Sequence, residues 1–497
     1  MRKVCDLAVE VQGGMQEHQD DAIWQDLLNL VFSFVNDEME SKVDAGLKIF
    51  TGLFSYIIEH VQAHTEDLGK VFEKTLGHPS LDIKLTALQA TCAYLGIGDR
   101  KHTKPFKLLL PLMTNVIHEA MVKEDETVLE DALVEFNELA EVEPGFFKTH
   151  FKQLFGGLKE IAAKSDFDNP TIRHQPIEFI VTLIERLPSV IKKDLETLKD
   201  LLETIFKLMI DIPEEIDEEW LTPKEGFATE EDEEDNVKFG QGCVDRLVSC
   251  LGEELMLPLT GQLVTNTIAN DVDWRYKHAG IMAFSQIGEY IEEASKISAM
   301  IPVLVEHLQH PNPKIRYASL HSIGQLADDM PKDFQEAYHT TIIPALLAAL
   351  DDPVPRVQAH ACAACTNFFE NVDPAVLKPY TQVICTKLCA MIKNGISIIK
   401  ENAVTTLATT AERNETEFAP YFKETLEFLI GFLNEFSSSA YKQFRGQTIE
   451  GITLICAAVG EETFKPLADD VIKVLLHVQN NQLDTQDCQR IYLLSSW

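Results

Sequence analysis

Hydrophobic and polar positions recur along the chain at the spacing expected of amphipathic helices. Three segments show the pattern most clearly: Ile315–Ile323, Val357–Cys365 and Ile399–Leu407. Each begins with a β-branched residue, has a small residue in fifth place and an apolar residue in ninth. These positions lie on one face of an α-helix, and the small residue allows a neighbouring helix to approach closely. The pattern predicts one buried helix in each repeat.

The first residue of this pattern, which we call the anchor, recurs along the whole chain. Successive anchors are 40, 45, 44, 67, 37, 39, 42, 42 and 45 residues apart, so eight of the nine intervals lie near 42. The long interval contains about 25 extra residues, and these coincide with an acidic stretch at 211–235. The ten anchors are Val43, Ile83, Val128, Ile172, Phe239, Tyr276, Ile315, Val357, Ile399 and Phe444.

A second helical pattern, rich in Leu and Phe, precedes each anchor helix. Residues 299–310 and 341–350 are examples, and each is followed by a turn with Pro and Asn or Asp, which ends one helix and suits the start of the next. No segment shows the sustained alternation of a half-buried strand. Two-helix units of 40–47 residues are typical of HEAT and armadillo repeats. The sequence therefore predicts an all-α, HEAT-repeat α-solenoid, a right-handed superhelix of about ten two-helix repeats.

This repeat organisation replaces the three or so ordinary domains that 497 residues would suggest. We expect HEAT repeats over residues 1–210, an acidic insertion loop within one repeat at 211–236, and further repeats over 237–497. Terminal repeats of a solenoid usually carry a polar capping face. Neither end of the sequence shows one, so we expect a fragment of a longer solenoid.

The charge balance restricts the partners. The chain has 79 acidic and 43 basic residues, a net charge of −36. Such a surface repels nucleic-acid phosphate and anionic membranes, so neither is expected as a direct partner, whereas basic proteins are. No apolar run approaches the roughly 18 residues of a membrane span. The ten cysteines lie in apolar periodic stretches, which indicates core packing in a reducing compartment, the cytosol or nucleus.

No catalytic signature is present. The sequence contains no Gly-rich phosphate loop, no G-x-S-x-G and no H-E-x-x-H. Cys362 and Cys365 form a C-x-x-C without a second pair, which favours buried packing over a zinc or redox site. We expect His278, His321 and His360 at the surface or on a groove wall. The sequence thus predicts a non-enzyme without cofactor or metal.

The acidic stretch is the first candidate functional feature. Residues 211–235 contain thirteen acidic residues and one lysine, and so supply −12 of the net charge. Such a block repels itself, and a solvated loop of no consequence is the plain alternative. Trp220 and Phe227 are candidates for docking on the solenoid or on a partner. The candidate residues of this loop are Glu218, Glu219, Trp220, Glu231, Asp232, Glu233, Glu234 and Asp235.

The second candidate functional feature is a row of acidic residues near the ends of successive anchor helices. Asp329, Glu370 and Glu412 recur there, with Asn367 and Asn402 on nearby turns. A helix C-terminus disfavours negative charge by up to about 1 kcal/mol, so their recurrence suggests a role. Stacked repeats would align carboxylates and amides about 10 Å apart, a spacing able to hold an extended lysine-rich peptide. Ordinary solubilising charge is an equally weighted alternative.

Several segments resemble one protein family. Residues 271–289, with the sequence DVDWRYKHAGIMAFSQIGE, closely resemble karyopherin-β (importin-β) proteins of the importin-5 type. The resemblance is strong from about residue 212 to 497 and rests on fewer segments before that. The other segments that carry it are His310–Tyr317, Arg356–His360, Asn367–Phe368, Glu214–Trp220, Gly460–Phe464, Tyr492–Trp497 and Arg2–Asp6.

The resemblance implies a nuclear import receptor that shuttles between cytoplasm and nucleus. Such a receptor holds lysine-rich localisation signals in its concave groove, contacts Phe-Gly nucleoporins in the pore, and releases cargo to the GTPase Ran in its GTP form. Ribosomal proteins and histones are typical cargo. By matching position, the resemblance assigns the lysine-holding acids to Asp329, Glu370 and Glu412, with Asn367 alongside. Because the N-terminal repeats that carry the main Ran contact are expected to be missing, we expect weakened Ran binding.

Two rivals share the fold. A HEAT-repeat scaffold or regulatory subunit would be expected to have near-uniform repeats and no long acidic insertion. A tubulin-binding array is poorly matched, because tubulin surfaces are acidic and would be repelled by this chain.

Overall fold

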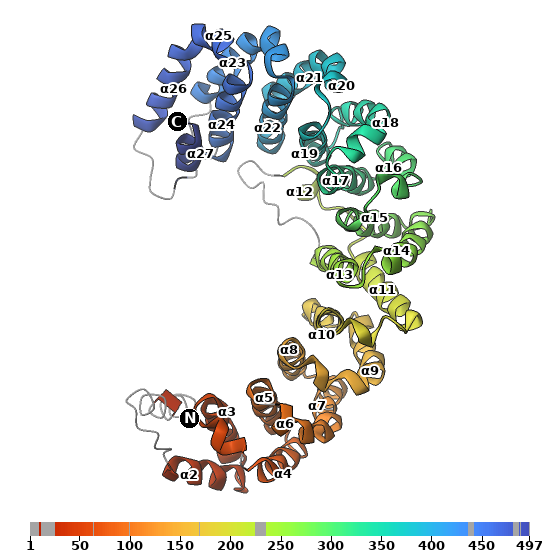
Figure 1. Ribbon diagram of the computed structural model, residues 1–497, viewed down its shortest axis with the longest axis vertical. Coiled ribbons are helices and arrows are strands. Elements are labelled where there is room, and N and C mark those ends of the chain that lie inside the picture. The colour runs from red at the N-terminus through yellow and green to blue at the C-terminus, as the bar shows by residue number, and fades with distance from the viewer. Residues whose placement is uncertain are drawn as a thin grey trace. The chain divides into compact units, whose positions relative to one another are not determined.

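A computed structural model of the chain (Figure 1) describes residues 9–10, 25–62, 64–98, 100–167, 169–223, 235–435, 442–480, 487 and 489–496. Every regular element within these residues is helical, which confirms the predicted all-α fold. The chain divides into two compact units, Met1–Leu208 and Met209–Trp497. The boundary falls within one helix, close to residue 211, where the insertion was predicted to begin. None of the described helices combines the length and apolarity that a bilayer crossing requires.

Unit 1 consists of helix pairs in which a first helix is followed by the second helix that carries the anchor. Short turns and 3-10 helices join them. The first helices are α2 (Gln25–Val35), α4 (Thr65–Leu76), α7 (Leu110–Lys123) and α9 (Phe151–Ala163). The second helices are α3 (Glu40–Gln62), α5 (Leu81–Ile97), α8 (Glu126–Val142) and α10 (His174–Arg186). The connecting elements are α6 (Arg100–Thr103), η1 (Lys104–Leu109), η2 (Pro144–Phe146), η3 (Lys148–His150), η4 (Pro170–Arg173) and η5 (Pro188–Val190).

The first helix α11 (Leu195–Ile210) ends unit 1 and has only its last two residues in unit 2, which continues the same alternation. The further first helices of unit 2 are α14 (Glu253–Ile268), α16 (Ile301–His307), α18 (Asp333–Ala349), α21 (Thr381–Asn394), α23 (Ala419–Glu435) and α26 (Ala468–Asn480). The second helices are α13 (Asp235–Leu251), α15 (Trp274–Phe284), α17 (Pro313–Asp329), α19 (Pro355–Glu370), α22 (Ser397–Asn414), α24 (Lys442–Ala458) and α27 (Gln489–Ser496). Short elements between them are α12 (Glu218–Leu221), η7 (Gly288–Tyr290), η8 (Ala294–Ile297), α20 (Pro374–Leu377), η9 (Lys378–Tyr380), η10 (Glu415–Phe418), α25 (Glu461–Phe464) and η12 (Lys465–Leu467).

The anchors lie in or directly before the first turns of the second helices, and eight of the ten are at most 5% exposed. Two differ from the prediction. Phe239 is only half-buried, and Tyr276 is 36% exposed. In these helices the first position of the pattern lies at the edge of the apolar face, while later positions such as Gly280 and Phe284 are buried.

The small fifth position serves close helix packing, as expected. In α15 this position is Gly280, and a Cβ there would lie 2.3 Å from Thr267 Oγ1 of α14. In α17 and α22 the fifth residues, Ser319 and Ala403, are fully buried. Larger side chains at these positions would separate helices whose close packing forms the core.

Ion pairing joins successive repeats through the basic residue that follows an anchor. Arg316 in α17 donates two hydrogen bonds to the carboxylate of Asp352, at 2.6 and 2.9 Å, in the turn before α19. Asp352 also accepts from the backbone N–H of Val354, which precedes that helix. The pair is nearly buried, so it ties one repeat to the next.

Candidate functional site

The second helices of unit 2 form a continuous layer. α15, α17, α19, α22 and α24 pack one against the next and lie on the inner side of this unit, while the first helices lie on its outer side (Figure 1). We call the solvent-facing surface of α13, α15, α17, α19, α22 and α24 the inner face. All the candidate side chains of the predicted acidic row belong to three of these helices.

The predicted acids lie at corresponding places on adjacent helices. Asp329 and Glu370 are the last residues of α17 and α19, and Glu412 lies in the last turn of α22. Glu370 and Glu412 are exposed. Partial burial raises the pKa of Glu412, and the nearby Glu370 carboxylate raises it further. These two acids are therefore electrostatic neighbours from different repeats, as the spacing predicts.

Asp329 has the most perturbed carboxyl group of the row. Burial raises its pKa to about 6, and the charges of Glu289 and Asp328 act in the same direction. Gln325 opposes the shift by donating a 2.7 Å hydrogen bond to Asp329 Oδ1. A cation placed against Asp329 would relieve this repulsion, because an opposite charge favours the ionised form.

The row is longer than the sequence analysis predicted. Glu289, in η7, lies near Asp329, and Glu450, in α24, contributes to the field at Glu412. In α13, Asp245 Oδ1 accepts a 2.8 Å hydrogen bond from Tyr290, whose pKa rises to about 12 through burial and this contact. These three acids do not end a helix, so a search at helix ends misses them. We call the set the acid ladder: Asp245, Glu289, Asp329, Glu370, Glu412 and Glu450.

The two predicted asparagines have different surroundings. Asn367 Nδ2 donates to the carbonyl of Gly324 at 3.2 Å and so bridges α19 and α17 between two acids of the ladder. Asn402 Nδ2 donates to Ile398 O at 2.9 Å within its own helix. Asn367 thus links two repeats, whereas the amide group of Asn402 donates a hydrogen bond within its own helix.

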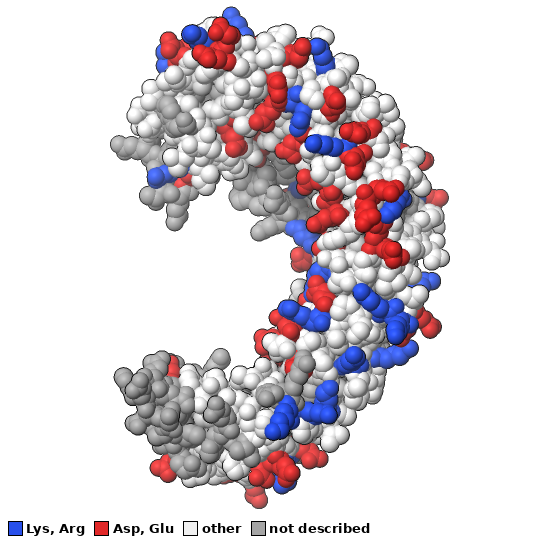
Figure 2. All heavy atoms as spheres, in the orientation of Figure 1, with Lys and Arg blue, Asp and Glu red and all other residues white. Residues whose placement is uncertain are grey.

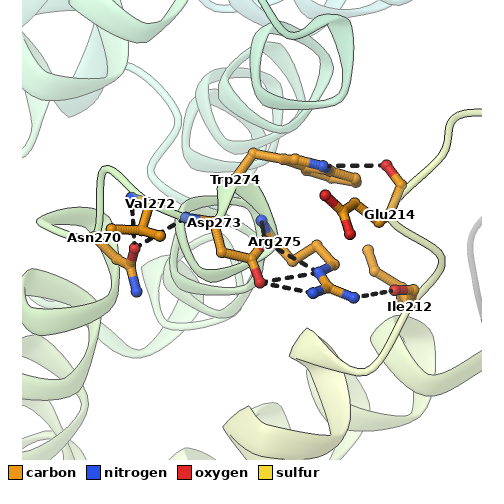
Figure 3. A network of polar contacts seen from close by, with 7 residues as sticks. All are labelled: Ile212, Glu214, Asn270, Val272, Asp273, Trp274 and Arg275. Carbon is orange, nitrogen blue, oxygen red and sulfur yellow. Dashed lines mark hydrogen bonds and ion pairs between the residues drawn. The ribbon is translucent and has the colours of Figure 1, made fainter.

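At the start of the acidic segment, two backbone carbonyl groups accept hydrogen bonds from side chains of α15 (Figure 3). Arg275 Nη1 donates to Ile212 O at 3.1 Å, and Trp274 Nε1 donates to Glu214 O at 3.3 Å. Asp273 orients Arg275 through both carboxylate oxygens and caps α15 by accepting from the Arg275 N–H. The segment most distinctive in the sequence, around Trp274, therefore holds the start of the acidic insertion in place.

Trp220 attaches this segment to the inner face by packing against α17 and α19. Residues 211–223, which we call the strap, contain the short helix α12, and its Trp220 is 8% exposed. The indole ring packs against Tyr317 of α17 at 5.6 Å between centroids, with Lys314 Nζ 4.2 Å from its centre. Arg356 of α19 lies 5.5 Å from the ring centre, and its Nε donates to Trp220 O at 2.6 Å.

The strap thus spans from the end of α11 to the third and fourth second helices of unit 2. Glu218 and Glu219 are exposed on α12, and Asp235 is exposed at the start of α13. Four candidate acids of the insertion, together with Phe227, lie outside the described residues: Glu231, Asp232, Glu233 and Glu234.

Two cysteines and one histidine singled out by the sequence analysis are buried in this region. Cys362 and Cys365 are fully buried, and burial raises their thiol pKa values above the ordinary range. His278 is 4% exposed, and burial lowers its pKa to about 3, so its expected place at the surface was wrong. Trp274 packs on its ring, Lys314 and His321 of α17 lie near it, and α15 is buried from Lys277 to Phe284. Over the part of the chain that the structure describes, no cluster of His, Cys, Asp and Glu has the arrangement of a metal site.

Unit 1 has two cavities that the sequence analysis did not identify. One, of about 1210 Å³, lies along α3, α5 and α8. Glu135 is one of its lining residues. Burial raises the pKa of Glu135 to about 7, and the charges of Glu138 and Asp131 act in the same direction. The other, of about 330 Å³, is a mainly apolar cleft between the first helices α7 and α9, and Gly157 opens it because it has no side chain.

Comparison with known proteins gives three matches to family profiles. A profile described as IPO5-like TPR repeats matches residues 1–156, one described as importin repeat matches residues 164–258, and a HEAT repeat profile matches residues 300–330. The first two together cover about half of the chain.

Curated relatives and solved structures agree with these profiles. Importin subunit beta-3 of Saccharomyces cerevisiae is 26% identical over 96% of this chain and 44% of its own length. A probable importin-5 homolog of Dictyostelium discoideum is 23% identical over 92% of this chain and 42% of its own. Kap121p bound to Nup53p superposes with a TM-score of 0.85 at 24% identity, over 96% of this chain and 45% of Kap121p.

The structure of Kap121p has also been solved in complex with Pho4p and as a variant with two aspartates and one glutamate changed to lysine. The superposition establishes a common α-solenoid fold, and this chain spans less than half the length of the curated relatives it matches. The importin profiles and the importin relatives aligned along nearly all of its length show that the chain belongs to the importin (karyopherin-β) family.

Proposed function

We propose that this chain binds lysine-rich segments of cargo proteins along the inner face of unit 2 and acts in their import into the nucleus. The acid ladder carries the proposal, because it places one carboxylate in each of six successive repeats, five of them on second helices and Glu289 in η7. The family is one of transport receptors, not of enzymes.

The spacing of the ladder suits an extended peptide. Second helices packed side by side lie about 10 Å apart, and an extended chain rises about 3.3 Å per residue. One acid therefore meets roughly every third residue of a bound segment. Asp329 is less exposed than Glu370 and Glu412 and should attract an ammonium group more strongly, since less water screens it. Asn367 lies between two of these acids and still has hydrogen-bonding capacity for a peptide backbone.

The relatives support this use of the inner face. Kap121p has been crystallised with Nup53p and Pho4p, and one crystallised variant replaces three acids by lysine. Those three acids follow one another by 43 and 42 residues, which is one repeat. In this chain two sets have similar spacing. Asp245, Glu289 and Asp329 are 44 and 40 residues apart, while Asp329, Glu370 and Glu412 are 41 and 42 apart.

Two triple variants separate these sets. We would measure binding of a labelled lysine-rich localisation peptide by fluorescence anisotropy to D245N/E289Q/D329N and to D329N/E370Q/E412Q, at about 50 mM and about 150 mM salt. The proposal expects salt-sensitive binding that at least one variant weakens about tenfold or more. Which variant loses more affinity identifies the half of the ladder that holds the lysines.

A matched control removes the same charge from the outer side. Glu306, Glu336 and Glu424 are exposed acids on the first helices α16, α18 and α23, and their triple Gln variant should bind as wild type does. Equal loss in this control would reduce the ladder to general negative charge. Absence of wild-type binding would favour a HEAT-repeat scaffold instead.

We further propose that the cleft between α7 and α9 receives a Phe side chain of Phe-Gly nucleoporins. It is lined by apolar residues such as Ile117, Leu154 and Leu158, and a volume of about 330 Å³ accommodates an aromatic ring. Gly157→Leu would fill it. Gly156→Leu is the matched control, because Gly156 has equally open surroundings but does not line the cleft. Loss of Phe-Gly peptide binding in both variants or in neither would contradict this assignment.

Release by Ran in its GTP form, shuttling between cytoplasm and nucleus, and ribosomal proteins or histones as cargo complete the proposal. The tests are co-precipitation with Ran loaded with a non-hydrolysable GTP analogue, and competition between Ran and the lysine-rich peptide. If the peptide binds and Ran does not compete with it, the proposed cargo site is supported and regulation by Ran within this part of the receptor is excluded.

A further inference from the structure

A third cavity in unit 1 has the opposite charge to the rest of the molecule. Four cationic side chains line about 430 Å³ of space: Lys104, Lys107, Lys148 and Arg186. They lie in two successive repeats, in η1 before α7, in η3 before α9, and at the end of α10. Figure 2 shows Lys and Arg side chains gathered on the viewed face of unit 1 over the segments between α6 and α11.

These cations do not form the ion pairs with carboxylates that other lysines of unit 1 form. Elsewhere in unit 1 lysines pair with carboxylates, as Lys84 does with Glu119 and Lys152 with Asp194. Among the described residues, by contrast, no carboxylate lies within 4.0 Å of the charged groups lining this cavity. Lys107 donates to Gly145 O at 2.8 Å, which fixes its position. Glu143 is the one acid in the lining.

Helix-terminal charge compensation does not account for the group. Arg186 ends α10, where a cation is favourable for the helix dipole. Lys104, Lys107 and Lys148 lie instead in short 3-10 helices that begin the next repeat, where that dipole effect does not apply. In a chain with a net charge of −36, a cluster of cations around one hollow therefore needs another explanation.

Apolar side chains form part of the remaining lining. Pro144, Phe146 and Leu187 line the cavity beside the cations. Apolar surface beside a few charged groups is the usual composition of a ligand pocket.

We infer that this basic cavity binds an acidic peptide segment of a partner protein, with one large apolar side chain inserted and flanking carboxylates on the four cations. The cavity volume is within the range of ligand pockets. A single-stranded nucleic acid fits less well, because such sites extend along a track and stack bases on exposed aromatic rings. Phe146, the aromatic residue of the lining, is 1% exposed. The inference is independent of the acid ladder, which takes ligands of the opposite charge.

The probe is a labelled short acidic peptide with one central Phe, titrated with the full chain and followed by fluorescence anisotropy. We expect K104Q/K148Q/R186Q to weaken binding about tenfold or more, and replacement of the Phe by Ala in the peptide to do the same. The matched control K192Q/K193Q/K207Q removes three exposed cations of unit 1 that do not line the cavity, and should change affinity less than about twofold.

Each other result overturns the inference. Equal weakening by the control would show a general effect of charge, and no wild-type binding would show that the cavity holds no acidic peptide. Tighter binding of a single-stranded oligonucleotide, lost in K104Q/K148Q/R186Q, would assign the cations to nucleic acid. Thermal unfolding of each variant checks that folding is retained, since all substituted side chains are exposed.

Discussion

The contact of Trp220 with the inner face leads to a sharp prediction about the strap. In Trp220→Ala the indole ring is lost, and with it the packing on Tyr317 and the two cation–π contacts from Lys314 and Arg356. The hydrogen bond from Arg356 can still form, because its acceptor is the backbone carbonyl. We therefore expect the strap to detach locally while the helix pairs of unit 2 remain folded.

The magnitude follows from the contacts. Burial of a Trp side chain, about 150–250 Å² at about 25 cal/mol per Å², is worth roughly 4–6 kcal/mol. Two cation–π contacts add about 0.5–2 kcal/mol each. The entropy that the released residues recover on opening is the same in wild type and variant, so it cancels in the comparison. We take the low end of the measured range for Trp→Ala, about 3 kcal/mol, as the loss of opening free energy, and this raises the equilibrium constant for opening roughly hundredfold.

Hydrogen exchange followed by mass spectrometry measures this directly. Amides of the strap should exchange about a hundredfold faster in Trp220→Ala, and those of α17 and α19 that face it should lose some protection. Glu218→Ala, in the same short helix but exposed, is the control and should leave exchange unchanged. Strap exchange within about threefold of wild type would refute the reasoning, because it would mean that the Trp220 contacts do not hold the segment.

Three further predictions concern stability and pH. Arg316→Met leaves Asp352 as a nearly buried, unpaired carboxylate and should lower the free energy of unfolding by about 3–5 kcal/mol in urea titrations, with most of the loss recovered when Asp352→Leu is added; full stability of the single variant would contradict this. Lysine-peptide affinity should fall about tenfold between pH 7 and pH 5, because Asp329, with a pKa near 6, becomes protonated, and Asp329→Asn should flatten this dependence; a wild-type profile as flat as that of the variant would exclude Asp329. Glu135 has a folded-state pKa of about 7, above its unfolded value, so the folded state is favoured most below about pH 4.5, and this contribution to stability is lost as the pH rises through 7. Glu135→Gln should therefore stabilise unit 1 by about 2 kcal/mol at pH 8 and by much less at pH 4. Equal shifts of the melting temperature at both pH values would contradict this.

The repeat architecture could be predicted from residue pattern alone. Each second helix buries its apolar face against neighbours close in sequence, so the spacing of anchors such as Ile315 and Val357 records the packing directly. The excess length of one interval located the insertion for the same reason. The positions of Asp329, Glu370 and Glu412 near the ends of successive helices also followed, because equal repeats place equal positions side by side.

Contacts between distant repeats could not be predicted in this way. Trp220 meets Arg356 across 136 residues. This pairing does not follow from the 42-residue period. The basic cavity likewise depends on segments of successive repeats that face one hollow. Periodicity specifies which face of each helix is buried, but the rotation between successive repeats and the path of an irregular segment are set by side-chain packing in three dimensions. Those two quantities determine which side chains meet, how deeply they are buried and hence how far their pKa values move.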